Sequence, residues 1–259
     1  MAKALLSWLM FPIYVWQGIG LRRRIERMRP PEGPSSGCFG RDEAPAGIRL
    51  LVVGDSSAAG VGVERMDDSL AVRLAERLHA VTGLTVAWRA VGANGAVSSE
   101  LRDHVVPNIA REAYTHILLS VGTNDVKNFH SLRRFKKGFG GLIYALRARW
   151  PDARIVWSPP VDMRRVPALP RGIGAVLEMR AQMVRRLGTR LCLERGAIPS
   201  TTLPRVEPAG FSRDGFHASA EGAAYCAGHL LSYVMGDHPP LQLASGHGAG
   251  SAVHSPSSS

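Results

Sequence analysis

Apolar residues along the chain form short runs that alternate with stretches of helical spacing. Within residues 69–81, for example, Leu70, Leu74, Leu78 and Val81 fall on one face of a helix. Short apolar runs of strand length occur at residues 48–53, 85–91, 116–121, 154–159 and 197–201. Further helices are expected at residues 98–112, 132–150, 175–194 and 219–235. This alternation predicts one α/β domain in which helices cover both faces of a parallel sheet.

The first 29 residues depart from this alternation. The run from Ala4 to Leu21 is uncharged and contains several aromatic side chains, and five arginines follow it within residues 22–29. We expect residues 1–29 to form a hydrophobic membrane anchor with a basic flank. A cleaved signal peptide and a buried helix of the folded domain are the alternatives. Because the basic residues follow the apolar run, we expect the folded domain to lie on the cytoplasmic side of a bacterial-type inner membrane. A periplasmic location of the domain is the alternative.

Composition marks two more segments outside the folded domain. Residues 30–47 are rich in Pro, Gly and Ser and are expected to be a linker. Residues 237–259 are rich in Gly, Ser and His and are expected to be a disordered tail. The folded domain is therefore expected to span residues 48–236.

The chain is strongly basic, with a net charge of +11 over 259 residues. Such a charge can attract nucleic acid or anionic lipid. The arginines are spread over several expected helices and no nucleic-acid-binding motif accompanies them, so no nucleic-acid partner is expected. Cys38, Cys192 and Cys226 lie far apart, which favours neither a disulfide framework nor a zinc site. No metal or cofactor is expected.

Polar segments follow the expected strands and precede the last helix. "GDSSAAG" places Ser56 after the first strand, "GANG" ends at Gly95 after the second, and "GTND" places Asn124 after the third. "RDGFH" places Asp214 and His217 just before the last helix. Ligands of parallel sheets bind beyond the carboxyl ends of the strands, so these segments are expected to share one site.

Together these segments offer the groups that acyl transfer by a serine requires. Asp214 can orient His217, which can accept the proton of Ser56, while backbone N–H groups and the Asn124 amide can bind an oxyanion. Each segment alone also has a structural explanation: a helix N-cap for Ser56, an Asx-turn for Asn124 and a tight turn at Gly95. The ordered set of four favours the catalytic interpretation.

The four segments resemble those of the SGNH hydrolases, also called GDSL-type esterases, over roughly residues 49–235. The resemblance implies a flavodoxin-like, three-layer α/β/α fold with a parallel sheet of about five strands. It also implies a carboxylic ester hydrolase with Ser56 as the nucleophile and Asp214 and His217 completing the triad. The Ser56 N–H, Gly95 and Asn124 would form the oxyanion hole, with Gly92 as a second candidate for the glycine. The chain departs from the family in reading "GDSS" where "GDSL" or "GDSI" is commoner.

A proline-rich segment at residues 158–174 follows the fourth strand and cannot be the interior of a helix. We expect Val161, Met163 and Val166 to help line a substrate pocket. Arg164 or Arg165 would meet a polar or anionic group of the substrate. A surface loop without a substrate role is the alternative.

Three functions are compatible with the sequence. The leading hypothesis is a membrane-attached serine esterase that acts on small acyl esters, lysophospholipids or thioesters. A carbohydrate O-deacetylase is the alternative within the same chemistry. A non-catalytic binding module at a membrane surface is the alternative from another class, and the retained Asp214–His217 pair argues against it.

Overall fold

The computed structural model describes residues 28–40, 46–204 and 207–237. Nearly all of the expected anchor and of the expected tail lies outside these residues. Membrane attachment through the run from Ala4 to Leu21 therefore stays a prediction. Across the described ranges, no helix combines the length and the apolar character that crossing a bilayer requires.

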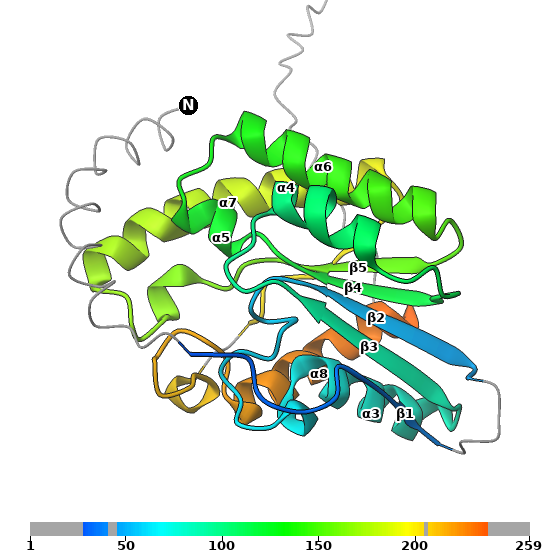
Figure 1. Cartoon of the computed structure of the whole chain (residues 1–259). Helices are drawn as coiled ribbons and strands as arrows, with labels where there is room; N and C mark the ends of the chain where they lie inside the picture. The colour runs from blue at the N-terminus through cyan, green and yellow to red at the C-terminus, as the bar shows by residue number, and fades with distance from the viewer. Residues whose placement is uncertain (1–27, 41–45, 205–206, 238–259) are drawn as a thin grey trace, which may run out of the picture.

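A six-stranded sheet in the order β1-β3-β2-β4-β5-β6 forms the centre of the domain (Figure 1). All pairings except that of β1 with β3 are parallel, which confirms the predicted α/β class. The parallel strands are β2 (Ile48–Gly54), β3 (Val86–Gly92), β4 (His116–Ser120), β5 (Arg154–Ser158) and β6 (Ile198–Pro199). They match the five apolar runs of the sequence.

The sixth strand, β1 (Ser36–Phe39), was not expected, because it lies inside the segment interpreted as a linker. It pairs antiparallel with β3 at the edge of the sheet, with Ser36 opposite Arg89 and Phe39 opposite Val86. A side chain at Gly37 would meet the Trp88 ring at 3.0 Å, so this strand lies close over that ring. Its pairing with β3 and its packing on Trp88 hold this segment as a strand. Its residues are mostly small and exposed, so the sequence shows no strand pattern there.

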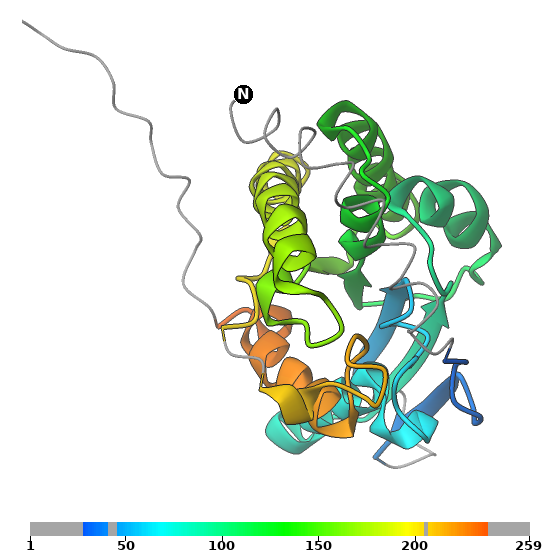
Figure 2. The same cartoon turned by 90° about the vertical axis from the view of Figure 1, so that its left-hand side faces the viewer.

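Helices cover both faces of the sheet, as Figures 1 and 2 show. One face packs against α3 (Leu70–Thr82) and α8 (Ala220–Met235). The other packs against α6 (Leu132–Arg149) and α7 (Arg171–Glu194), with the short α4 (Ser98–Glu100) and α5 (Thr123–Lys127) nearby. Alternate residues of β2 belong to the two cores: Leu50 and Val52 face α3 and α8, and Leu51 and Val53 face α6 and α7.

Two helices differ from their predicted bounds. The helix expected at residues 98–112 is α4, which continues through a π turn and a 3-10 turn only as far as Asn108. Pro107 lies in that last turn and has no N–H to extend a helix. Helix α7 begins at Arg171, four residues before the predicted start at Ala175, directly after Pro170. Gly174 lies within this helix, where a Cβ would come within 3.1 Å of the Met163 carbonyl oxygen, so its lack of a side chain lets α7 pass close to that backbone.

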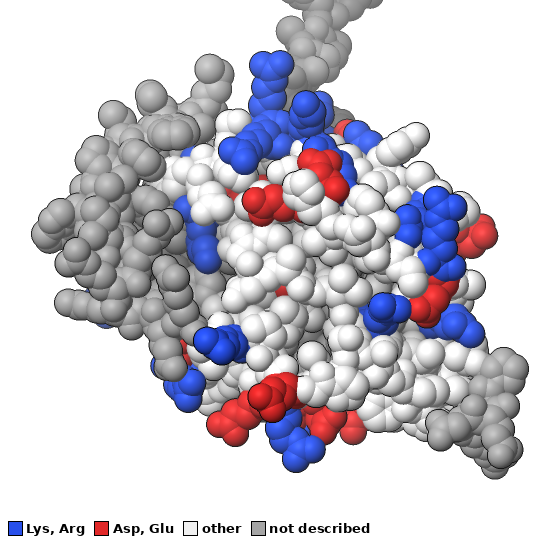
Figure 3. Space-filling model, viewed as in Figure 1, with Lys and Arg blue, Asp and Glu red and all other residues white. Residues whose placement is uncertain are grey.

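Basic side chains are distributed over several elements of the domain. On the face drawn in Figure 3, Lys and Arg lie among Asp and Glu and do not form a single stripe.

Candidate active site

Ser56 lies in a tight turn at the carboxyl end of β2. The Ala59 N–H donates to the Asp55 carbonyl at 3.1 Å, and the Val61 N–H donates to the Ser56 carbonyl at 3.0 Å. The turn begins at Gly54. A Cβ on Gly54 would come within 2.0 Å of the Ser120 carbonyl oxygen, so only glycine fits there. The turn is thereby pressed against β4, and Ser56 lines the cavity beyond the sheet.

Asp214 and His217 form a hydrogen-bonded pair before α8. His217 Nδ1 lies 2.6 Å from Asp214 Oδ2. Oδ1 of Asp214 accepts hydrogen bonds from the N–H groups of Phe216 and His217 and from the Ser212 hydroxyl, at 2.8–2.9 Å. Burial opposes ionisation of this carboxyl, but the bonds from His217, Phe216 and Ser212 outweigh it and lower its pKa. The carboxylate is therefore ionised and leaves Nε2 of His217 available to a second partner.

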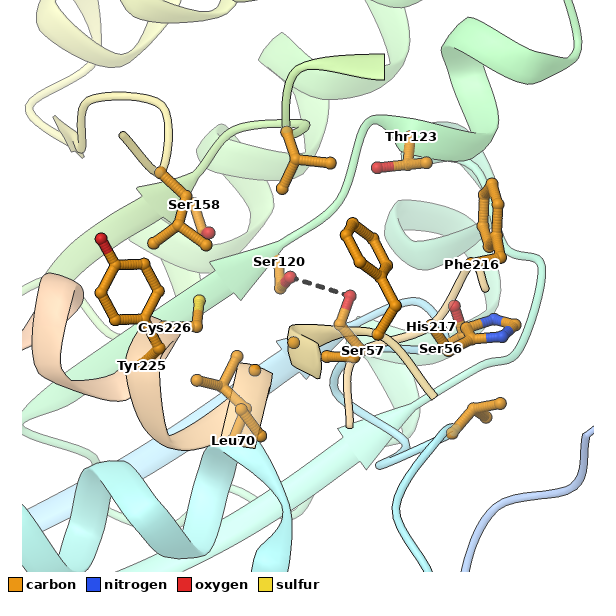
Figure 4. Close-up of a pocket in the computed structure, with 18 of the residues that line it drawn as sticks. Ser56, Ser57, Leu70, Ser120, Thr123, Ser158, Phe216, His217, Tyr225 and Cys226 are labelled. Carbon is orange, nitrogen blue, oxygen red and sulfur yellow. Dashed lines mark hydrogen bonds between the residues drawn. The ribbon is translucent and has the colours of Figure 1, made fainter. Parts of the chain in front are cut away.

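Ser56 and His217 line one cavity, and Figure 4 shows them at the same end of it. Gly62 allows this approach, because a Cβ on Gly62 would come within 2.7 Å of the His217 Cβ. The structure thus brings three sequence-predicted residues, Ser56, Asp214 and His217, from opposite ends of the domain into one place. The arrangement can support proton transfer from a serine to an imidazole held by a carboxylate.

Asn124 lies in α5, is buried, and also lines the cavity. Its amide nitrogen donates to the Ala96 carbonyl at 3.0 Å and to Asp55 Oδ2 at 3.3 Å. Asn124 thus lies within the short helix α5, whereas the structural alternative considered from the sequence was an Asx-turn. The longer contact leaves the amide as a donor that a negatively charged ligand could attract away from Asp55.

Asp55 is a site residue that sequence reasoning missed. Its side chain is buried next to Ser56, where it accepts hydrogen bonds from the Ser57 N–H and hydroxyl and from Asn124. Burial is the largest influence on this carboxyl and raises its pKa, although Ser57 stabilises the charge. The sequence signal that could have identified Asp55 was its position directly before Ser56. Asp55 connects the turn after β2 to the helix after β4.

The structure leaves the two candidate glycines in different settings. Gly95 has a φ of +82°, and a Cβ there would meet open space, so its backbone conformation is what favours glycine. Gly95 is not among the residues that line the cavity, and its donor role stays a prediction. Gly92 packs against Ala59, whose N–H would lie 2.1 Å from a Cβ, so close packing explains this glycine.

The loop after β5 is held by α7. The buried Glu178 carboxylate accepts from the Met163 N–H at 3.0 Å and pairs with Arg185. Arg185 also donates to the Pro160 and Val161 carbonyls, at 3.2 Å each. These contacts fix one wall of the cavity.

The cavity has a volume of about 620 Å³ and is lined by residues from the ends of β2, β4 and β5 and from α8. Val161, Met163 and Val166 line it, and their contact with a substrate stays a prediction. Arg164 does not; its guanidinium donates to Asp162 at 2.7 and 3.0 Å and lowers the pKa of that carboxyl to about 2. Arg164 is thus paired with Asp162 and does not line the cavity, and a contact of Arg164 or Arg165 with a substrate stays a prediction. The apolar members of the lining are Val61, Val63, Leu70, Val121, Pro159, Pro160, Val161, Met163, Val166, Leu203, Phe211, Phe216, Ala218, Ala223 and Ala224.

No group of three or more His, Cys, Asp or Glu side chains that could hold a metal ion occurs in the part of the chain that the structure describes.

Comparisons with known proteins bear on the family and on the fold. A model of the GDSL-like Lipase/Acylhydrolase family matches residues 52–225. A GDSL-like esterase of Mycobacterium tuberculosis is 23% identical over 199 residues, which cover 74% of this chain but only 63% of that protein. A lipase from a goat rumen metagenome has a TM-score of 0.59 at 13% identity, covering 72% of this chain and 97% of that one. An acetylxylan esterase from Geobacillus stearothermophilus has a TM-score of 0.57 at 15% identity, covering 74% and 96%. At these identities the two structures show a shared fold.

Proposed function

Because this chain belongs to the GDSL-like lipase/acylhydrolase family, we propose that it is a serine esterase that hydrolyses acyl esters through Ser56, His217 and Asp214. The observation that carries the proposal is the Asp214–His217 pair, at 2.6 Å, whose imidazole lines the same cavity as Ser56. A binding module would have no use for an ionised carboxylate that orients an imidazole beside a serine.

In the proposed mechanism, Nε2 of His217 accepts the proton of Ser56 as Oγ attacks the acyl carbon. The Asp214 carboxylate holds the proton on Nδ1 and stabilises the imidazolium that forms. His217 then donates its proton to the leaving alcohol, which departs and leaves an acyl-enzyme. A water molecule, deprotonated by His217, attacks that ester, and Ser56 is released with its proton restored.

The negative charge of the tetrahedral intermediate requires donors already in place. We assign this task to the N–H groups of Ser56 and Gly95 and to the Asn124 amide. The 3.3 Å contact between Asn124 and Asp55 supports the assignment, because one amide hydrogen is only weakly held in the free enzyme. An oxyanion beside Ser56 would be a stronger acceptor.

Replacing Asn124 by alanine is expected to lower kcat by about 10²–10³-fold, the usual cost of one oxyanion donor. Steady-state hydrolysis of a p-nitrophenyl ester measures the loss. Asn128→Ala is the matched control, because Asn128 is exposed at the end of the same helix and does not line the cavity. Unchanged kcat in folded Asn124→Ala would remove Asn124 from the oxyanion hole.

The alcohol and acyl parts of the substrate define two versions of the proposal. Lipid-derived esters and thioesters suit the apolar lining of the cavity. Carbohydrate O-deacetylation is the second version, and the acetylxylan esterase with the same fold makes it worth testing. Rates on acetate esters relative to longer acyl esters separate the two.

The serine assignment is tested by covalent capture. The full chain is incubated with a fluorophosphonate, and the adduct is mapped by peptide mass spectrometry. We expect one adduct, on Ser56, together with turnover of p-nitrophenyl esters. Heat-denatured protein is the control for non-specific labelling. Neither adduct nor turnover, from protein shown to be folded, would favour the non-catalytic binding module.

A further inference from the structure

The cavity continues well past the candidate nucleophile. Figure 4 shows Ser56 and His217 at one end, Tyr225 and Cys226 at the other, and Ser57 between them. Ser57 is exposed and lines this space, although Ser56 before it is half-buried and Ala58 after it is buried. We call the part beyond Ser57 the inner arm; it is bounded by Ser57, Leu70, Ser120, Ser158, Tyr225 and Cys226. The small side chain of Ser57 leaves its entrance open.

The serines at the entrance offer fewer hydrogen-bond donors than their number suggests. The Ser57 hydroxyl donates to Asp55 Oδ1 at 2.8 Å, and the Ser120 hydroxyl donates to the Ser57 oxygen at 3.2 Å. Both hydroxyl hydrogens are thereby committed within the protein. At this entrance a sugar or another polyol would find acceptor oxygens on Ser57 and Ser120 but no uncommitted hydroxyl hydrogen from them.

The remaining bounding residues place apolar surface beside the hydroxyls of Ser158 and Tyr225. Leu70 and the Tyr225 ring contribute apolar surface. Burial raises the pKa of the Cys226 thiol to about 12, so this group is neutral at physiological pH. The whole cavity, of which the arm is one part, has a volume of about 620 Å³, which lies within the usual range for small-molecule sites and far exceeds the needs of an acetyl group.

The direction of the reaction decides which part of an ester would enter the arm. If Ser56 attacks as proposed, His217 must reach the leaving oxygen, so the alcohol lies on the His217 side. The acyl substituent then points away from His217, towards Ser57 and Cys226. The acyl group also stays bound during the second half-reaction, when an apolar site holds it in place.

We propose that the inner arm binds the hydrocarbon chain of the acyl group, and that the small side chain of Ser57 admits medium-length chains. This inference rests on the proposed esterase function and specifies its substrate class. The protein is then an esterase for acyl groups longer than acetyl, and residue 57 determines specificity.

The test compares p-nitrophenyl acetate, butyrate and octanoate. In the wild-type protein kcat/KM is expected to rise by about two- to fourfold for each methylene that enters the arm. Ser57→Leu fills the entrance and is expected to lower the octanoate-to-acetate ratio of kcat/KM by at least about tenfold. Cys226→Leu fills the far end and is expected to lower octanoate turnover more than butyrate turnover. This second variant keeps the test decisive if Ser57→Leu does not fold.

Two control variants isolate the effect of bulk at residue 57. Ser57→Ala removes the hydroxyl without adding volume, so its octanoate-to-acetate ratio should stay near that of the wild type. Ser36→Leu makes the same substitution on the exposed edge strand β1, outside the cavity, and should leave every rate unchanged.

Three results would overturn the acyl assignment while leaving the esterase standing. One is wild-type turnover confined to acetate, and another is an octanoate-to-acetate ratio that Ser57→Leu and Cys226→Leu do not change. The third is a series of acetates of longer alcohols whose rates, and not those of the acyl series, respond to both variants. Absence of any turnover together with absence of a fluorophosphonate adduct would instead remove the esterase function itself.

Discussion

Ser56→Ala is expected to lower kcat for ester hydrolysis by about 10⁶-fold, the cost of removing a triad nucleophile. An alanine methyl group cannot form the acyl-enzyme, so only the oxyanion donors and substrate binding would still accelerate the reaction. The turn that holds Ser56 is maintained by backbone hydrogen bonds, which the substitution keeps. The melting temperature should therefore remain close to that of the wild type. Steady-state kinetics and calorimetry on the same preparations measure both quantities.

Ser57→Ala is the matched control, because Ser57 is the next residue and also faces the cavity. Its hydroxyl is held by Asp55 and Ser120, and His217 lies at the Ser56 end of the cavity in Figure 4. Ser57→Ala should keep most of the activity on p-nitrophenyl acetate. If instead Ser57→Ala loses activity and Ser56→Ala retains it, the nucleophile is Ser57 and the proposed mechanism is wrong.

The sequence was informative about the site where one short segment carries both the chemistry and its placement. Ser56 follows an apolar strand at once, and Asp214 and His217 are three residues apart before a helix that Ser219 caps. Such local patterns are set by the nature of turns and strand ends. They needed no knowledge of the packing.

The contacts that join these segments could not be predicted in the same way. Asp55 meets Asn124 across 69 residues of sequence only because β2 and β4 are neighbours in the sheet. The strand β1 likewise depends on its position over Trp88. For Arg164 a local signal did exist, because Asp162 lies two residues earlier and pairs with its guanidinium.

Asp125 shows how packing supports the site without chemistry. Its buried carboxylate accepts from the N–H and hydroxyl of Ser98 at the start of α4, and contacts His130 Nδ1 at 3.1 Å. It therefore ties α5, which carries Asn124, to α4. An acidic residue beside a candidate catalytic amide can thus be structural, and only its partners distinguish the two cases.

Asp214→Asn is expected to lower kcat by about 10⁴-fold while preserving the turn around residue 214. The asparagine oxygen can replace Oδ1 and accept the bonds from Ser212, Phe216 and the His217 N–H. Its NH₂ group then faces Nδ1 of His217 and donates to it, which forces the ring proton onto Nε2. A protonated Nε2 cannot accept the proton of Ser56. Nitrogen-15 NMR of the imidazole measures this tautomer directly.

The pH dependence of stability provides an independent check on Asp214. Because its pKa is lowered in the folded protein, the ionised carboxylate stabilises the fold. This contribution is complete above the ordinary Asp pKa of about 3.9 and is lost as the pH falls through the lower, folded value. The asparagine variant lacks the titration, so the gap between its free energy of unfolding and that of the wild type should shrink below about pH 4. In the kinetics of Asp214→Asn, a large loss of kcat with Nδ1 still protonated would show that Asp214 acts by some means other than fixing the tautomer. Full activity of this variant would exclude Asp214 from the triad.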